Sequence, residues 1–317
     1  MNDKYGRTIN YLRVSVTDRC NLRCVYCMPD DGIQKLEHEE ILSFEDILKI
    51  IRASAELGIK KIRFTGGEPL VRKGIENLIY ETSKINGIDD IAITTNGTRL
   101  YDMAGDLKRA GLNRVNISLD TLKADRFKNI TRLGNIDDVF RAIDKSLAIG
   151  LEPIKVNMVV IRGVNDDEVF DFVKLADENP LHIRFIEVMP IGEGERFKDG
   201  YISSDDLIRS ISNLTEIETG QNSTARVFER QGAKGTIGFI SPLTCKFCTG
   251  CNRIRLTSTG TIKPCLHSKE EIDLKDFLRD ERHLKAILEH TIFNKPLEHH
   301  LEEAISQSQK KMFQIGG

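Results

Sequence analysis

Seven cysteines, in two groups far apart in the sequence, are the residues of this 317-residue chain best suited to metal chemistry. The first group is Cys20, Cys24 and Cys27, in a C-x3-C-x2-C spacing. Three thiolates this close can hold an iron–sulfur cubane in which each iron takes one protein ligand, so one iron stays open for chemistry. A structural zinc site is the alternative, although zinc sites favour C-x2-C pairs. We therefore expect a catalytic iron–sulfur cluster here.

The second group contains Cys245, Cys248, Cys251 and Cys265. Cys248, Cys251 and Cys265 alone form a C-x2-C-x13-C spacing, which leaves one position of a cubane open. With Cys245 the set has four thiolates and suits a closed structural zinc site. The spacing alone does not decide between an iron–sulfur cluster and zinc at this second site.

Basic residues near these cysteines and near the ends of predicted strands form a candidate anion site. Arg253 and Arg255 stand at i and i+2 of a predicted strand, so they face the same side and can bind phosphate through paired hydrogen bonds. Others are Arg13, Arg63, Lys155 and Arg184. The chain has 46 basic and 48 acidic residues, so its net charge predicts no nucleic-acid or membrane partner. The local clustering predicts a polyanionic small molecule such as a triphosphate.

An alternation of short apolar strands and amphipathic helices must position these side chains. The predicted strands are residues 11–17, 61–65, 91–95, 114–119, 154–161 and 182–188, and the predicted helices are residues 44–57, 75–85, 100–110, 136–149 and 167–177. This order indicates parallel strands with crossover helices. Six units are too few to close an eight-fold barrel, so we predict an α/β fold with an incomplete (β/α)6 TIM-like barrel. A doubly wound open sheet is the alternative. In either case the carboxyl ends of the strands carry the site.

The alternation weakens after about residue 203. Strand candidates follow at 225–230 and 235–240, then helical candidates at 274–288 and 296–308. We predict a partial barrel with the first cluster at 1–212 and a smaller α+β domain with the second cluster at 213–317. No apolar leader or membrane-spanning stretch is apparent, so we expect a cytoplasmic protein.

The cysteine triplet, with Tyr26 before its last cysteine and Gly66-Gly67-Glu68-Pro69 further on, resembles the radical S-adenosylmethionine enzymes. This resemblance implies that Cys20, Cys24 and Cys27 hold a [4Fe-4S] cluster. The open iron would bind S-adenosylmethionine (SAM), and reduction would cleave it to methionine and a 5′-deoxyadenosyl radical. The implied SAM site contains Tyr26, Gly67, Ser118 and Met189.

Five further segments resemble one family of that superfamily, the GTP 3′,8-cyclases (molybdenum cofactor biosynthesis protein A). They are YLRVSVTDRCN at 11–21, RGVN at 162–165, FIEVMP at 185–190, FCTGCNRIRL at 247–256 and KPCL at 263–266. The resemblance implies a lyase that cyclises GTP to (8S)-3′,8-cyclo-7,8-dihydroguanosine 5′-triphosphate, the first step of molybdenum cofactor biosynthesis. The radical would take the 3′ hydrogen of the ribose, and the C3′ radical would add to C8 of the guanine.

The same resemblance implies the remaining site residues and partners. The GTP site would contain Arg13, Arg63, Thr94, Lys155, Arg184, Arg253 and Arg255. Cys248, Cys251 and Cys265 would hold a second [4Fe-4S] cluster that meets the guanine, and Cys245 is not a ligand in the family. The terminal Gly316 and Gly317 would reach into the active site. Partners would be an electron donor and, as product acceptor, cyclic pyranopterin monophosphate synthase; monomer and homodimer both stay open.

Two other functions remain as alternatives. Another radical enzyme with an auxiliary cluster, such as a peptide-modifying one, would share both cysteine groups, although such enzymes generally need more cysteines in the tail. A zinc-bound adaptor without catalysis would use both groups structurally.

Overall fold

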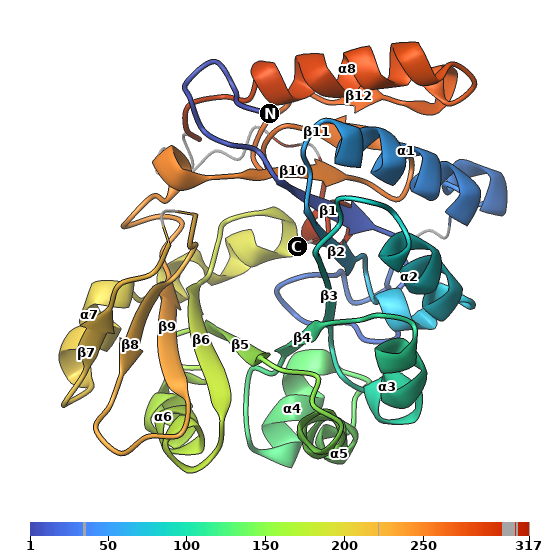
Figure 1. Cartoon of the computed structure of the whole chain (residues 1–317). Coiled ribbons are helices and arrows are strands. Elements are labelled where there is room, and N and C mark those ends of the chain that lie inside the picture. The colour runs from blue at the N-terminus through green and yellow to red at the C-terminus, as the bar shows by residue number, and fades with distance from the viewer. Residues whose placement is uncertain (34–35, 221, 300–307, 309, 317) are drawn as a thin grey trace.

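The computed structural model describes residues 1–33, 36–220, 222–299, 308 and 310–316. A mixed sheet of 12 strands, in the order β12-β11-β10-β1-β2-β3-β4-β5-β6-β9-β8-β7, curves around a central space (Figure 1). Its middle is the parallel run β1 to β6, and the crossover helices cover the outer face of that run (Figure 1). The predicted incomplete barrel is confirmed. The doubly wound alternative is wrong, because it would need helices on both faces of the sheet.

The parallel strands are β1 (Tyr11–Ser15), β2 (Lys61–Thr65), β3 (Asp90–Thr95), β4 (Arg114–Ser118), β5 (Ile154–Val160) and β6 (Leu181–Glu187). The helices outside them are α1 (Phe44–Glu56), α2 (Ile75–Ser83), α3 (Leu100–Arg109), α4 (Ala124–Thr131), α5 (Ile136–Ala148) and α6 (Val169–Glu178). The predicted bounds of all six strands and of five helices agree with the structure to within two residues. Helix α4 was missed.

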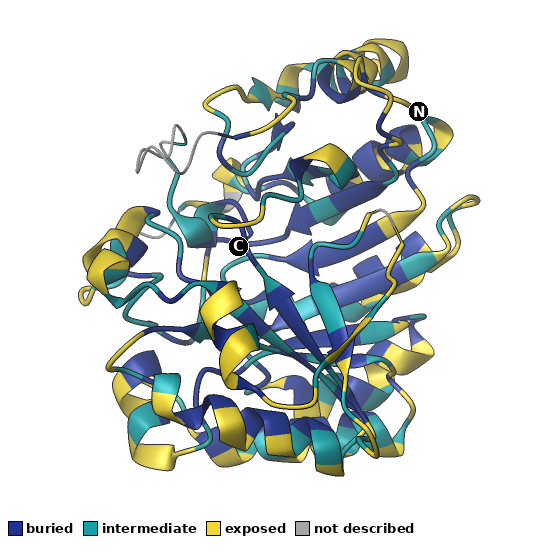
Figure 2. Ribbon diagram, turned by 90° about the vertical axis from the view of Figure 1, so that its left-hand side faces the viewer, coloured by how far each residue is buried: buried dark blue, intermediate teal, exposed yellow. Residues whose placement is uncertain are grey.

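Periodicity explains why these segments form these elements. In α5, the buried residues Ile136, Val139 and Ile143 recur at helical spacing, and Asn135 caps the helix by accepting from the Asp137 backbone N–H. In β5, buried and half-buried residues alternate, so that one face packs on the helices and the other lines the interior. Figure 2 shows the result, with buried residues along the sheet and the inner faces of the helices and exposed residues outside.

The chain after residue 203 extends both edges of the same sheet. Its elements are α7 (Ser204–Ser210), β7 (Thr215–Ile217), β8 (Arg226–Glu229), β9 (Thr236–Ile240), β10 (Arg253–Leu256), β11 (Thr261–Lys263), β12 (Ile272–Asp273) and α8 (Glu281–Phe293). Strand β9 pairs parallel with β6, and β10 pairs parallel with β1 at the other edge. Strands from both sides of residue 212 belong to one sheet. The division into two domains at that residue therefore stays a prediction.

The end of the chain differs from expectation. The helix predicted from residue 274 begins at Glu281, because Asp280 accepts from the backbone N–H groups of Arg282 and His283 and so caps it there. Most of the helix predicted at 296–308 lies outside the described residues. None of the helices in the described ranges is long and apolar enough to cross a membrane.

Candidate active site

A cavity of about 740 Å³ lies inside the curve of the sheet. Its wall includes six of the seven cysteines: Cys20, Cys24, Cys27, Cys248, Cys251 and Cys265. The fold thus brings together two groups that are more than 200 residues apart in the sequence. The volume falls within the range of small-molecule sites, about 300–1,000 Å³.

The first cysteine loop is held by the end of α4. The backbone N–H of Val25 donates to the carbonyl of Ile130 over 3.0 Å. Arg132, directly after the helix, donates from Nη1 to the carbonyls of Arg23 at 2.7 Å and Met28 at 3.1 Å. Arg132 therefore holds together the two ends of the segment that contains Cys24 and Cys27.

The three thiols suit a cationic iron–sulfur cluster. Burial raises the pKa of Cys20 to about 11 and that of Cys27 to about 12, so bare thiolates would be costly and a bound metal would supply the missing positive charge. Donors to sulfur are already in place. The Asn96 side chain lies 3.8 Å from the sulfur of Cys20, and the Phe313 backbone N–H hydrogen-bonds Cys27.

Gly66 and Gly67 are needed for a reason that the sequence did not reveal. Their lack of a side chain suggested close approach to a ligand. In the structure, a Cβ on Gly66 would lie 2.5 Å from the carbonyl oxygen of Thr17, and one on Gly67 would lie 2.5 Å from that of Arg19. The two glycines allow the end of β2 to pack directly on the backbone that leads into the cysteine loop.

The four residues expected to bind SAM all line the cavity: Tyr26, Gly67, Ser118 and Met189. Tyr26 donates from its hydroxyl to Asp120 Oδ2 over 2.6 Å, and the Val159 backbone N–H donates to Asp120 Oδ1 over 2.9 Å. Burial raises the pKa of Asp120 to about 6. Asp120 was missed as a site residue; its position directly after β4 and Ser118 was the available signal.

Three arginines from adjacent strands form one row on the cavity wall. Arg13 on β1 lies in register with Arg63 on β2 and with Arg255 on β10. Neighbouring strands are about 4.8 Å apart, so the row concentrates positive charge. Burial and the repulsion from Arg255 lower the pKa of Arg13, and burial and the repulsion from Arg253 lower that of Arg255 to about 10. Only a bound anion would relieve this repulsion fully.

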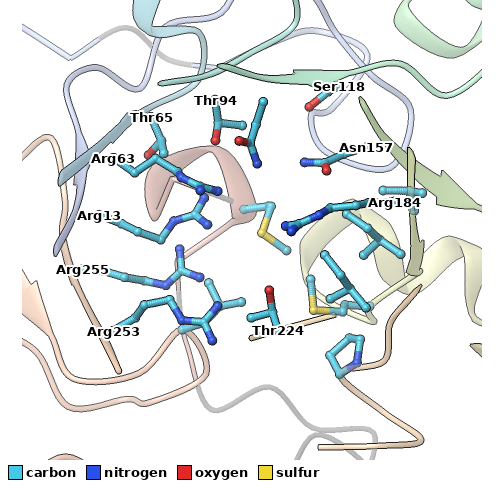
Figure 3. A pocket seen from close by; sticks show the side chains of 18 of the residues that line it. Arg13, Arg63, Thr65, Thr94, Ser118, Asn157, Arg184, Thr224, Arg253 and Arg255 are labelled. Atoms are coloured by element: carbon cyan, nitrogen blue, oxygen red, sulfur yellow. The ribbon is translucent and has the colours of Figure 1, made fainter. Parts of the chain in front are cut away.

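The opposite wall carries Arg184, which points toward the arginine row (Figure 3). It is in register with Asn157 on β5 and Ser118 on β4. Lys155 lies two residues before Asn157 and shares its face. Burial, then repulsion by Arg184, lowers the pKa of Lys155 to about 7, and burial lowers that of Arg184 to about 10.

Several buried polar atoms point to a ligand in this space. Within the described part of the chain, Arg63 Nε, Arg253 Nε and Nη2, Thr94 Oγ1 and Asn157 Oδ1 have no hydrogen-bond partner. A buried polar atom without a hydrogen-bond partner lowers the stability of the fold, unless a ligand binds it. A triphosphate nucleotide would satisfy both the arginine donors and the neutral polar groups.

Among the cavity residues that were not predicted as ligands, Lys61, Arg114 and Asn157 also carry polar or charged groups. Lys61 and Asn157 each lie two residues from a predicted ligand, Arg63 and Lys155, so strand alternation was the signal that could have found them.

The C-terminal tail reaches the arginine row. The carbonyl of Gly316 accepts from Arg13 Nη2 at 2.9 Å and from Arg255 Nη1 at 3.0 Å. Gly316 has φ +67°, and a Cβ there would overlap the Thr65 hydroxyl, so only glycine fits. Gly317 lies outside the described residues.

The second cysteine group separates into three residues and one. Cys248, Cys251 and Cys265 line the cavity, whereas Cys245 is exposed and lines a neighbouring pocket instead. Burial raises the pKa of Cys251, but Lys295 and Arg253 outweigh it and bring the value to about 6, which favours the metal-binding thiolate. The structure thus separates the exposed Cys245 from the three cysteines that line the cavity.

Comparisons with known proteins agree with this geometry. The model of the Radical SAM superfamily matches residues 14–176, and that of Molybdenum Cofactor Synthesis C matches residues 181–301. A protein named GTP 3′,8-cyclase from Clostridium botulinum (strain Langeland) is 59% identical over 100% of both chains, and one from Clostridium acetobutylicum is 56% identical over 100% of both. The chain belongs to the GTP 3′,8-cyclase family of radical SAM enzymes. This membership implies SAM and a [4Fe-4S] cluster as its cofactors.

Solved structures of two proteins with bound S-adenosylmethionine share the fold. Streptococcus suis SuiB bound to S-adenosylmethionine superimposes with a TM-score of 0.65 at 16% identity, over 86% of this chain and 65% of that chain. The histidine-tagged protein anSMEcpe with bound AdoMet gives 0.52 at 16% identity, over 89% of this chain and 83% of that chain. At these identities the likeness concerns the fold alone.

Proposed function

We propose that this radical SAM enzyme is a lyase that converts GTP into (8S)-3′,8-cyclo-7,8-dihydroguanosine 5′-triphosphate, the first step of molybdenum cofactor biosynthesis. The observation that carries the proposal is the row Arg63, Arg13 and Arg255, which faces Arg184 across the cavity that also holds the first cysteine triplet. The row suits a triphosphate, and the triplet suits radical initiation at the same place.

The first cysteine group would anchor the cofactors. Cys20, Cys24 and Cys27 would hold the [4Fe-4S] cluster, and SAM would contact Tyr26, Gly67, Ser118 and Met189. When bound, this pair supplies the 5′-deoxyadenosyl radical that removes a hydrogen atom from the substrate. The hydroxyl of Ser118, at the end of β4, and the Tyr26–Asp120 pair offer polar groups at the cavity wall for the nucleoside part of SAM.

The basic residues would hold GTP in one orientation. Arg13, Arg63 and Arg255 would clamp the triphosphate on one wall, and Arg184 and Lys155 would do so on the other. Thr94 and Arg253 carry unpartnered buried atoms that are free to bind the same nucleotide. A clamped triphosphate fixes the ribose, so that C3′ can lie near the radical and within reach of C8.

The tail would take part in shaping this site. The Gly316 carbonyl now accepts the hydrogen bonds of Arg13 and Arg255 that phosphate oxygens would accept. GTP must therefore share these two arginines with the tail or displace it. The proposed role of Gly316 and Gly317 is to close the substrate space at the arginine row.

The second cysteine group would hold a second [4Fe-4S] cluster through Cys248, Cys251 and Cys265. Its three thiols line the same cavity as the arginine row, which supports a role for a cluster held there in contacting the guanine of a nucleotide bound to that row. The exposure of Cys245 supports this three-ligand assignment.

The proposal includes partners outside the chain. An electron donor must reduce the first cluster, and cyclic pyranopterin monophosphate synthase would accept the product. Free cysteines in such number suit a reducing compartment, which supports a cytoplasmic location.

Anaerobic turnover with GTP deuterated at C3′ tests the reaction. We expect deuterium in the 5′-deoxyadenosine and a cyclised nucleotide that retains its triphosphate. GTP deuterated at C2′ is the matched control and should transfer none. SAM cleavage without deuterium transfer from C3′ would refute the proposed hydrogen abstraction, and zinc in place of iron would refute the radical chemistry altogether.

A further inference from the structure

The N-terminal segment before β1 contains a buried arginine that the proposed reaction does not use. Arg7 is 8% exposed, and its Nε donates to Asp3 Oδ2 over 2.6 Å. Asp3, which is 5% exposed, also accepts from the backbone N–H of Arg7 over 2.9 Å. A buried ion pair of this kind is costly to form and needs further hydrogen bonds on its remaining donors.

Those remaining donors bind four backbone carbonyls. Arg7 Nη1 donates to the carbonyls of Cys248 and Leu297, each at 2.8 Å. Nη2 donates to the carbonyls of Pro296 at 2.6 Å and Lys295 at 3.3 Å. Three consecutive carbonyls after α8 thus turn toward one guanidinium. Arg7 joins the segment 295–299 to the loop that carries Cys248.

Lys295 extends from that segment into the second cysteine site. It is 2% exposed, and its Nζ donates over 2.6 Å to the carbonyl of Pro264, the residue before Cys265. The Lys295 side chain also hydrogen-bonds Cys251. A charged donor this deeply buried has a large desolvation cost, which contacts with a thiolate and a carbonyl offset.

The same segment supplies a second donor to sulfur. The backbone N–H of His299 hydrogen-bonds Cys248. Residues 295–299 therefore donate hydrogen bonds to Cys251 and Cys248, and to the carbonyl of Pro264, the residue before Cys265. One buried residue at the start of the chain, Arg7, binds the backbone from which these donors extend.

We propose that Arg7 and Lys295 are positioning residues of the second cysteine site, where Arg7 fixes the segment 295–299 and Lys295 provides a charged hydrogen bond to Cys251. This inference rests on the proposed second [4Fe-4S] cluster. Hydrogen bonds and positive charge next to cluster sulfurs favour the reduced state, because they stabilise the added electron. Removing the ammonium while keeping a long apolar side chain should make the midpoint potential of that cluster more negative.

Lys295→Met tests the role of the charge. The variant is made in a chain in which Cys20, Cys24 and Cys27 are all alanine, so that only the second cluster gives a signal. We expect about four irons per chain with or without Lys295→Met. The midpoint potential in an electron paramagnetic resonance titration should shift to more negative values, and Lys295→Arg should restore much of it. Lys285→Met, which removes a surface ammonium of α8 that pairs with Glu56 of α1, is the matched control and should leave the potential unchanged.

Arg7→Gln tests the role of the anchor in the otherwise unchanged chain. We expect the iron content to fall toward half of the wild-type value, while SAM cleavage without GTP, which needs only the first cluster, continues. Arg52→Gln, at an exposed position of α1, is the matched control and should keep all its iron.

The outcomes distinguish failure of the proposed second cluster from failure of the positioning role of Arg7 and Lys295. A wild-type chain with only about four irons would overturn the second cluster itself. A wild-type chain with about eight, together with an unchanged potential in Lys295→Met and full iron in Arg7→Gln, would overturn the positioning role and leave the proposed function intact.

Discussion

Binding of GTP is expected to draw a proton onto Lys155. This side chain faces the cavity from β5, and burial together with Arg184, Arg114 and Arg63 lowers its pKa to about 7. A triphosphate placed against Lys155 would supply negative charge and return the pKa toward the 10.5 of a free lysine. Above pH 7, the complex then holds a proton that the free enzyme lacks.

The size of this effect follows from the two pKa values. At pH 8 a group with a pKa of about 7 is about 10% protonated, so binding should take up about 0.9 proton. Between pH 7.5 and pH 8.5 the charged fraction of Lys155 falls from about 0.24 to about 0.03, and the Kd for GTP should rise about eightfold. Lys155 binds more protons in the unfolded chain than in the folded chain from pH 7 to 10.5, so the unfavourable contribution of this one group to the stability of the free enzyme should shrink as the pH rises through that range.

Calorimetry of GTP binding at pH 8, in two buffers with different ionisation enthalpies, measures the proton uptake. The wild type is compared with Lys155→Met. Protons that GTP itself releases or binds contribute equally in both proteins, so the difference in proton uptake reports on Lys155. Lys174→Met, at an exposed position of α6, is the matched control and should behave as wild type. Equal proton uptake by the wild type and Lys155→Met would refute the reasoning.

Three further predictions concern the cysteine sites. Gly67→Ala should destabilise the fold by about 1–3 kcal/mol in thermal unfolding, because the new Cβ meets the Arg19 carbonyl at 2.5 Å; an unchanged melting temperature would contradict the contact. Arg132→Gln should release the first cysteine loop at a cost of about 1.5–3 kcal/mol for each lost charged hydrogen bond, and should lower SAM cleavage without GTP; normal cleavage would argue against it. Cys245→Ser should keep about eight irons per chain whereas Cys251→Ser should lose about half; iron loss in Cys245→Ser would make it a ligand.

Local patterns predicted the elements of the barrel well, and they failed where the signal was weak or non-local. Helix α4 was missed because it is only eight residues long and Lys123 offers no side-chain cap. The pairing of β9 with β6 and of β10 with β1 was not predictable either. Periodicity describes one segment at a time, and it contains no information on which distant strand will cover an open edge.

The sequence by itself determined the chemical groups of this protein. The C-x3-C-x2-C triplet, the C-x2-C pair with a distant third cysteine, and the arginines on predicted strands follow from residue type and spacing, which are covalent properties of the chain. Strand alternation also determined that Lys155 and Asn157 share a face.

Only the tertiary structure decided how these groups meet. It placed Arg13, Arg63 and Arg255 in one row, separated Cys245 from the other cysteines, and showed that Gly67 is packed on the cysteine loop. Burial and through-space charge depend on every element around a residue, so no local pattern contains them. For the same reason, the low pKa of Lys155 and the contacts of Arg7 with a segment 288 residues away were visible only in the folded chain.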